Sequence, residues 1–140
     1  MKIYTLRLKP DEDLKSALLS YAKEQGIKAG SILTCVGSLK EASLRMAGAL
    51  PDKQDTRIYK DIYEIVSLTG TLNHDDCHLH LAISDKEGKV YGGHLKNGSL
   101  IETTAEIVII EDDSVVYTRE LDEVTGFMEL KTTKRKQKTS

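Results

Sequence analysis

Apolar and polar residues alternate with a period of two through most of the chain from Ala29 onward. Successive side chains of a β-strand point to opposite faces of a sheet, so this period is typical of strands with one buried face. Residues 10–26 instead follow a helical period, with an apolar stripe from Leu14 to Tyr21. We therefore expect an α+β fold with a mostly antiparallel sheet of about seven strands and one long N-terminal helix.

Several details of this fold follow from local patterns. In the first strand, residues 2–8, Ile3 should point inward together with Leu6 or Leu8. Asp11 or a neighbouring acid should cap the helix, whose first turn is rich in acids, and Gly26 should end it. The remaining strands are expected at 29–39 and 41–50 (joined near Lys40), at 61–72, and in two hairpins, 77–95 and 105–121, the second turning at EDD.

The composition is that of a single globular domain. A chain of 140 residues buries roughly two thirds of its unfolded surface and needs no disulfide. Cys35 and Cys77 have no CxxC spacing, so we interpret them as buried, reduced thiols. The N-terminus lacks the apolar core of a signal peptide, and no apolar run approaches the ~20 residues that span a bilayer. These features predict a cytoplasmic protein, or a nuclear one if the source is eukaryotic.

Positive charge is concentrated at the C-terminus. The net charge is −2, yet the last ten residues contain five basic residues and no acid. We expect a disordered tail there that contacts nucleic acid, because the acidic remainder of the chain would repel it. The basic residues of this tail are Lys131, Lys134, Arg135, Lys136 and Lys138.

Three of the four histidines fall in residues 77–95, CHLHLAISDKEGKVYGGHL. His78 and His80 share one strand face, opposite an apolar face. A three-residue turn with Gly88 in the left-handed conformation would pair His80 with His94 on that same face. A two-residue turn would pair His80 with Gly93 instead and direct His94 to the other face.

Three converging imidazoles suit zinc or another divalent metal, with one coordination position left open. We therefore predict a metal site at His78, His80 and His94. The alternative is that these are polar residues of a sheet face packed under a neighbouring subunit. His74, in the NHDD loop, is expected to lie in solvent.

Several motifs together resemble one known family, the plant-and-prokaryote-conserved (PPC) domain. They are RLKPDEDL, SILTCVGSLKEASL, YEIVSLTGTL, HLHLAISDKEGKVYGGHL and NGSLIETTAEIVI, and the similarity runs from Lys2 to Leu121. The resemblance implies a homotrimer, an association with DNA or transcription, and a metal at the three histidines. It also implies a PPC domain over residues 1–125, which leaves 126–140 as a last short strand and the basic tail.

The match also has informative details. Arg7 and Glu64 stand where the family has a strand-end arginine and an acidic residue, so Arg7 should pair with an acid or a partner, or simply lie on the surface. Pro10 replaces a common glycine. No RGRP core is present, so this chain lacks the motif with which the plant members bind the minor groove of DNA. Their mode of DNA binding is therefore not expected here.

These features favour a trimeric, DNA-binding regulatory module with a three-histidine metal site. Other proteins are further candidate partners, and no membrane association is expected. The alternative is a metal-dependent enzyme or small-ligand-binding protein that uses the same site. No G-x-S-x-G, P-loop or dinucleotide motif is present. The spacing of Glu64, Glu102 and Glu106 does not place them near the metal, which favours a binding module over an enzyme.

Overall fold

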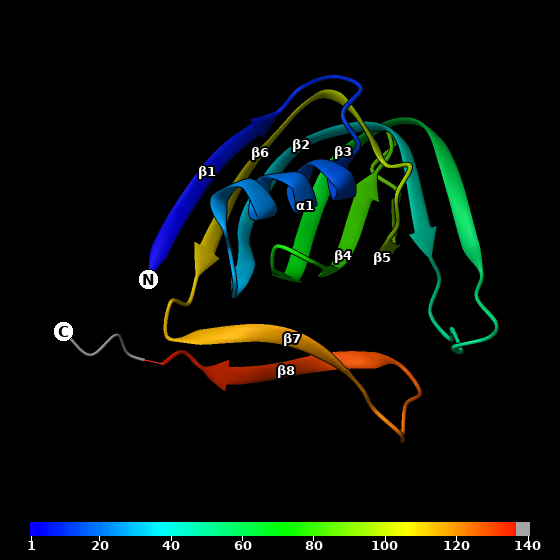
Figure 1. Cartoon of the computed structure of the whole chain (residues 1–140). Coiled ribbons are helices and arrows are strands. Elements are labelled where there is room, and N and C mark those ends of the chain that lie inside the picture. Colours follow the sequence, from blue (N-terminus) through cyan, green and yellow to red (C-terminus); the bar gives the residue numbers. More distant parts are fainter. Residues whose placement is uncertain (137–140) are drawn as a thin grey trace.

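The computed structural model describes residues 1–136, which form eight strands and one helix (Figure 1). The predicted α+β class with a mostly antiparallel sheet is confirmed, with eight strands in place of about seven. The elements are β1 (Lys2–Leu8), α1 (Leu14–Gln25), β2 (Gly30–Arg45), β3 (Thr56–Leu72), β4 (Cys77–Ser84), β5 (Val90–Leu95), β6 (Leu100–Glu111), β7 (Val115–Leu121) and β8 (Met128–Lys134).

The main sheet is strongly curved and wraps around the helix. Its six strands run in the order β1-β6-β2-β3-β4-β5, and every neighbouring pair is antiparallel. The end of β2 also pairs with β5, where Leu44 faces Leu95 and Arg45 faces His94. Because of this second pairing, the end of β2 lies against the β4–β5 hairpin that contains the histidines.

The helix α1 lies against the concave side of the sheet (Figure 1) and buries Leu14, Leu18 and Ala22 there. Its N-cap is Asp13, whose Oδ1 accepts a hydrogen bond from the Ser16 amide at 2.9 Å. The expectation of several acids in the first turn is wrong, because the acids of this segment precede the helix. No helix in residues 1–136 is long and apolar enough to cross a membrane.

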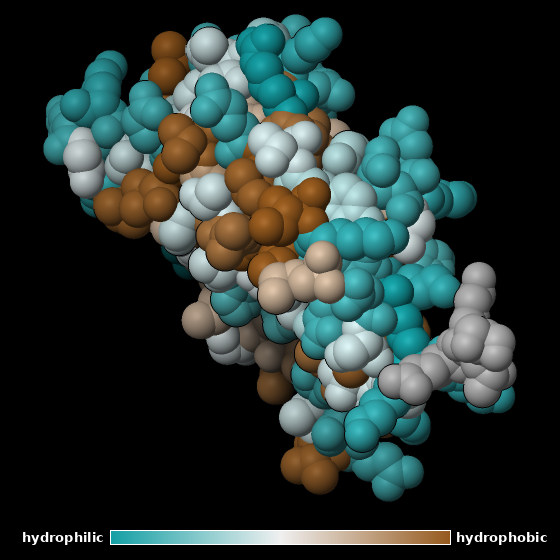
Figure 2. Space-filling model, turned by 90° about the vertical axis from the view of Figure 1, so that its left-hand side faces the viewer, coloured by the Kyte–Doolittle hydropathy of each residue, from teal (hydrophilic) through white to brown (hydrophobic). Residues whose placement is uncertain are grey.

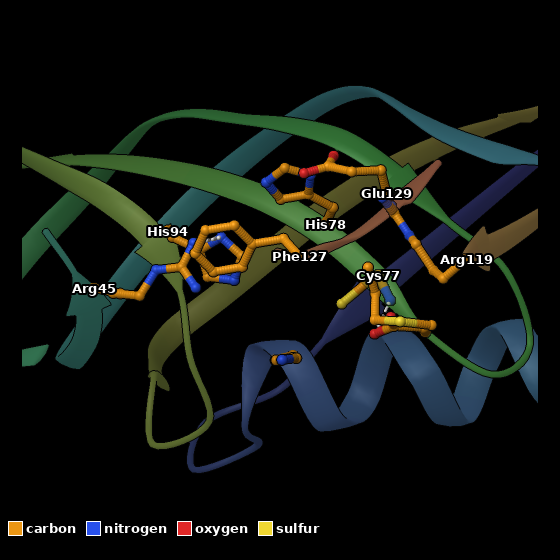
Figure 3. Close-up of a pocket in the computed structure, with 10 residues that line it drawn as sticks. Arg45, Cys77, His78, His94, Arg119, Phe127 and Glu129 are labelled. Atoms are coloured by element: carbon orange, nitrogen blue, oxygen red, sulfur yellow. Dashed lines mark hydrogen bonds between the residues drawn. The ribbon is translucent and has the colours of Figure 1, made fainter. Parts of the chain in front are cut away.

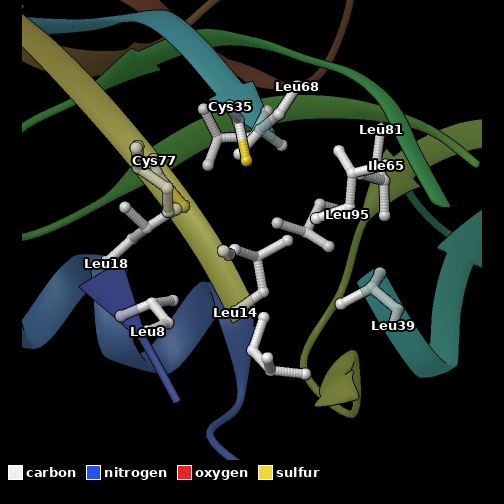
Figure 4. Close-up of a cluster of buried hydrophobic side chains, with 14 of the residues drawn as sticks. Leu8, Leu14, Leu18, Cys35, Leu39, Ile65, Leu68, Cys77, Leu81 and Leu95 are labelled. Carbon is white, nitrogen blue, oxygen red and sulfur yellow. The ribbon is translucent and has the colours of Figure 1, made fainter. Parts of the chain in front are cut away.

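The core fills the space between α1 and the sheet (Figure 4). Both cysteines lie in it as free thiols, as the sequence predicts. Burial raises the pKa of Cys35 to about 12 and that of Cys77 to about 11. Both thiols are therefore protonated at neutral pH, and they act as small apolar side chains.

The structure corrects the boundaries of two strands. Residues 30–45 form one continuous strand, β2, rather than two strands that join near Lys40. An irregularity between Leu39 and Glu41 shifts the register against both β3 and β6, so the polar residue at position 40 is absorbed as a bulge. The following strand, β3, begins at Thr56 rather than at residue 61.

One predicted side-chain orientation and one predicted strand pairing are also wrong. In β1, Ile3 points outward and is 64% exposed, whereas Leu8 is buried. The alternation therefore starts one residue later than expected. The strand β6 pairs with β1 and β2 instead of forming a hairpin with β7, and β7 pairs with β8 in a separate two-stranded sheet.

The β7–β8 hairpin is fastened to the main sheet by a buried carboxylate. Glu111, at the end of β6, is 2% exposed. It accepts hydrogen bonds from Arg135 (2.7 Å), from the hydroxyl of Tyr4 (3.0 Å) and from the amide of Lys28 (3.0 Å). Burial alone would raise the pKa of Glu111, but these three donors hold it below its ordinary value.

Replacing this carboxylate should destabilise the fold. We expect Glu111→Gln to lower the free energy of unfolding by about 1–3 kcal/mol at pH 7, because a charge-assisted hydrogen bond is lost from a buried site. Urea unfolding measures the change. Glu120→Gln, which breaks an exposed ion pair with Lys131 in the same hairpin, is the control and should change stability by less than about 1 kcal/mol.

The same pair of variants also gives a pH dependence. A carboxyl with a lowered folded pKa stabilises the protein above its unfolded pKa, and this contribution disappears as the pH falls through the folded value. The difference in the free energy of unfolding between wild type and Glu111→Gln should therefore be largest at neutral pH. It should decrease as the pH falls below the ordinary carboxyl pKa of 4.5. Equal effects of Glu111→Gln and Glu120→Gln would contradict this role.

Candidate metal centre

The turn between β4 and β5 has the three-residue form that the sequence predicts. The Asp85 amide donates to the Lys89 carbonyl (3.0 Å), and the Gly88 amide donates to the Asp85 carbonyl (2.9 Å). Gly88 has φ of 81°, a conformation that a residue without Cβ adopts at little cost. The side chain of Asp85 also accepts from the Glu87 and Lys89 amides, which holds the loop in this shape.

This turn sets the register of the hairpin. His80 of β4 faces His94 of β5 directly, which confirms the predicted pairing and excludes the two-residue turn. His78 lies two residues before His80 and on the same face of β4. The ring centroids are 5.0 Å apart for His78 and His80, 5.1 Å for His78 and His94, and 5.7 Å for His80 and His94.

The three imidazoles form a group that fits a metal ion. One ring nitrogen from each lies within 4.8 Å of the others. A tetrahedral zinc with Zn–N bonds of ~2.0–2.1 Å separates its ligands by about 3.4 Å, so small rotations of the side chains would close the group around an ion. Within residues 1–136, no carboxylate or thiol joins the group, which leaves a coordination position for a further ligand.

The protonation state suits a metal as well. Burial, and next the neighbouring His80, lower the pKa of His78. Burial, and next the Arg45 guanidinium, lower the pKa of His94 to about 3. At neutral pH both rings are therefore neutral and have a free lone pair, as metal ligation requires.

The close approach of β3 to β4 at this site depends on Gly70. Its φ is 137°, and a Cβ built there would lie 1.9 Å from the carbonyl oxygen of His78. Any other residue at position 70 would push β3 away from the strand that presents His78 and His80. The sequence alone does not reveal this requirement, because a lone glycine in a strand has several explanations.

Residues far from the histidines in the sequence complete the surroundings of the site. A cavity of about 330 Å³ adjoins His78 and His94 and is lined in addition by Lys15, Arg45, Arg119, Phe127 and Glu129, among others. Figure 3 shows the Glu129 carboxylate directed toward His78, and Phe127 between Arg45 and the rest of the cavity. The Arg45 guanidinium carbon lies 5.7 Å from the centre of the Phe127 ring.

The β7–β8 hairpin therefore forms one wall of the site. Phe127 and Glu129 come from its turn and from β8, and Arg119 comes from β7. Tertiary hydrogen bonds between residues distant in sequence bring this hairpin to the main sheet, among them the one from Arg119 to the Thr71 hydroxyl at 3.1 Å. No sequence spacing signals such a contact.

The other residues singled out in the sequence do not join the histidine group. Arg7 lies exposed on β1, where its Nε donates to Thr104 Oγ1 at 2.9 Å. It forms no ion pair with the described residues. Glu64 lies exposed on β3 and faces Ser84 of β4. His74 is partly buried, with Nδ1 3.3 Å from the Ile27 carbonyl oxygen and Nε2 3.1 Å from the Asp75 carboxylate.

The basic residues of the C-terminal segment have different surroundings. Lys131 and Lys134 belong to β8, and Lys131 pairs with Glu120 at 2.9 Å. Arg135 is held by Glu111, and Lys136 is exposed. Lys138 lies outside the described residues. Because β8 pairs with β7, the predicted boundary at 125/126 passes through one two-stranded sheet, and that division stays a prediction.

Comparison with known proteins supplies the family. The model of the Plants and Prokaryotes Conserved (PCC) domain matches residues 1–113. Two relatives, both named bifunctional protein GlmU and both from Synechococcus strains, are 42% and 43% identical over 130 residues, which is 93% of this chain. The chain spans about 20% of the length of these relatives.

Several solved structures have the same fold as this chain. A hypothetical protein from Salmonella is 35% identical with a TM-score of 0.90, and the alignment covers 96% of this chain and 94% of that one. A candidate DNA-binding protein from Bacteroides thetaiotaomicron is 25% identical, with a TM-score of 0.80 and coverage of 92% and 91%. A metal-containing protein from Archaeoglobus fulgidus is 25% identical, with a TM-score of 0.78 and coverage of 93% of each chain. The chain thus belongs to the plant-and-prokaryote-conserved domain family.

Proposed function

We propose that this protein is a metal-binding module in which His78, His80 and His94 hold zinc or a similar divalent ion. The observation that carries the proposal is the convergence of three imidazoles from two adjacent strands, with one ligand nitrogen of each within 4.8 Å of the others. Similarity to the metal-containing protein of Archaeoglobus fulgidus supports it. An ion held there would supply Lewis acidity to a ligand in the open position.

We further propose that the module assembles as a homotrimer. The sheet face away from α1 exposes large apolar side chains, among them Val36 of β2 (61% exposed) and Val66 of β3 (54% exposed). Ser38 faces Glu64 in the antiparallel β2–β3 register. Val36, two residues before Ser38, and Val66, two residues after Glu64, therefore lie on the same face. Figure 2 shows apolar side chains gathered near the middle of one face of the molecule, which favours a covering partner.

The third part of the proposal is nucleic-acid contact through the C-terminal segment, which would give the protein a regulatory role in the cytoplasm or nucleus. The support is similarity to the candidate DNA-binding protein of Bacteroides thetaiotaomicron together with the basic residues that follow β7. Three copies of the segment in one trimer would raise avidity well above that of a single weak site.

A metal-dependent enzyme or small-ligand-binding protein is the alternative for the same site. Two observations favour ligand binding, namely the open coordination position and the adjoining cavity of about 330 Å³. The Synechococcus relatives contain a matching segment as a fifth of a larger bifunctional protein. A module that senses or holds a ligand beside an enzyme is consistent with that arrangement.

The metal proposal predicts about one divalent ion per chain in protein purified without a chelator or a histidine tag, measured by elemental analysis. His80→Ala should lose most of this metal, because two imidazoles bind far more weakly than three. His74→Ala is the matched control and should keep it, since His74 lies outside the group. Metal-free wild-type protein, or equal metal in both variants, would count against the site.

The trimer proposal predicts a particle mass of three times the 15.6 kDa chain by size-exclusion chromatography with light scattering. Val36→Lys and Val66→Lys should lower the mass, because each places a charge in a buried interface. Val124→Lys makes the same change in the β7–β8 turn, at a residue that is 95% exposed, and should leave the mass unchanged. A monomeric wild-type protein would refute the assembly.

The nucleic-acid proposal predicts salt-sensitive DNA binding that depends on the lysines of the C-terminal segment. Truncation would also unpair β7, so substitution to Gln is the cleaner test, and Arg135 is left in place because it holds Glu111. The four lysines replaced are Lys131, Lys134, Lys136 and Lys138, and the matched control replaces Lys2, Lys9, Lys53 and Lys86.

Fluorescence anisotropy at several salt concentrations measures the effect. Each lysine that contacts phosphate should reduce the slope of log K against log salt by about one. The control protein has the same net charge and should bind like wild type. If both variants bind DNA as tightly as the unchanged protein, the segment does not form the contact.

A further inference from the structure

The cavity beside the histidine group has a positively charged lining that metal ligation does not use. Lys15 of α1, Arg45 at the end of β2 and Arg119 of β7 all line it, and each side chain is half-buried. Two carboxylates, Asp76 and Glu129, also line it. The cations therefore outnumber the acids by one, and a divalent ion at the histidines would add two further positive charges.

These three cations lack counter-charges of their own. None of them lies within 4 Å of a carboxylate oxygen in the part of the chain that the structure describes. Arg119 donates to the hydroxyl of Thr71 at 3.1 Å, and Arg45 stacks over Phe127. A half-buried guanidinium without an anion is poorly compensated for its lost hydration, so an anion in this cavity would be stabilised.

Metal binding would make Arg45 more available. Arg45 Nη2 lies 3.4 Å from His94 Nδ1, which can accept a hydrogen bond only through its lone pair. In a metal-bound imidazole, one nitrogen gives its lone pair to the ion and the other carries a proton. Arg45 then has no acceptor on His94, and its guanidinium is free to bind another group.

We propose that this cavity binds a small-molecule oxyanion, a carboxylate or phosphate group, with one oxygen at the open metal position and the others accepting hydrogen bonds from Arg45 and Arg119. The inference rests on the proposed metal centre and names the class of its ligand. A guanidinium fork matches both groups in a bidentate arrangement. The cavity volume of about 330 Å³ lies at the lower end for small-molecule sites, which fits a compact metabolite.

The test uses protein loaded with Co²⁺, whose visible absorption reports the ligands of the ion. Malonate and inorganic phosphate represent the two sources of the oxyanion, and malonamide is the neutral control of malonate's shape. We expect malonate or phosphate to change the cobalt spectrum and to bind at least tenfold more tightly than malonamide. The tighter of the two identifies the preferred group, and competition between them shows that they share one site.

Substitutions then locate the site. Arg45→Gln and Arg119→Gln should each weaken anion binding roughly tenfold or more while cobalt remains bound, because each removes a charge-assisted hydrogen bond. Arg7→Gln, at the opposite edge of the main sheet, is the matched control and should bind like wild type. Circular dichroism and melting temperature verify that each variant is folded, and either arginine variant suffices if the other does not fold.

The outcomes separate the two proposals. If Co²⁺ does not bind at the histidines, the metal centre fails, and the anion site that rests on it fails too. If Co²⁺ binds but neither anion exceeds malonamide, or if both arginine variants bind anions as wild type does, the oxyanion proposal is overturned and the metal centre stands.

Discussion

The pairing of His80 with His94 is the constraint on which the site depends, and the turn at Asp85–Lys89 sets it. Side chains alternate along a strand, so a shift of one residue between β4 and β5 would direct His94 into the core and leave two imidazoles on the outer face. Gly88, at φ of 81°, allows the three-residue turn that prevents this shift. A single residue in an exposed turn thereby decides whether three ligands share one face.

Long-range contacts then give the histidine group its chemical character. The second pairing of β2, with β5, places Arg45 opposite His94. The β7–β8 hairpin, held by the contact between Glu111 and Arg135, adds Phe127, Arg119 and Glu129. The result is a group of three imidazoles beside half-buried cations. Burial, and next the neighbouring cation Arg45, lower the pKa of His94, and burial lowers that of His78. The same cations favour anions next to the ion that the rings would bind.

Local patterns were sufficient to predict the helix, the β4–β5 hairpin, the buried thiols and the three histidines, because these depend on alternation and turn chemistry. They were not sufficient for the pairing of β6 or for the course of β2. An adjacent hairpin and a distant pairing bury the same apolar face, so the periodicity of 105–111 could not distinguish β7 from β1 and β2 as partners. Arg45, Arg119 and Phe127 were missed for the same reason, since each reaches the site through tertiary contacts alone.

X-ray absorption spectroscopy of the zinc-loaded protein tests the central claim most directly, because it identifies the atoms bound to the ion. The structure predicts three imidazole nitrogens at about 2.0–2.1 Å together with one oxygen ligand from water or a bound anion. A sulfur ligand near 2.3 Å would place the ion at a cysteine instead. A spectrum without the scattering from the outer ring atoms of metal-bound imidazoles would likewise contradict the three-histidine centre.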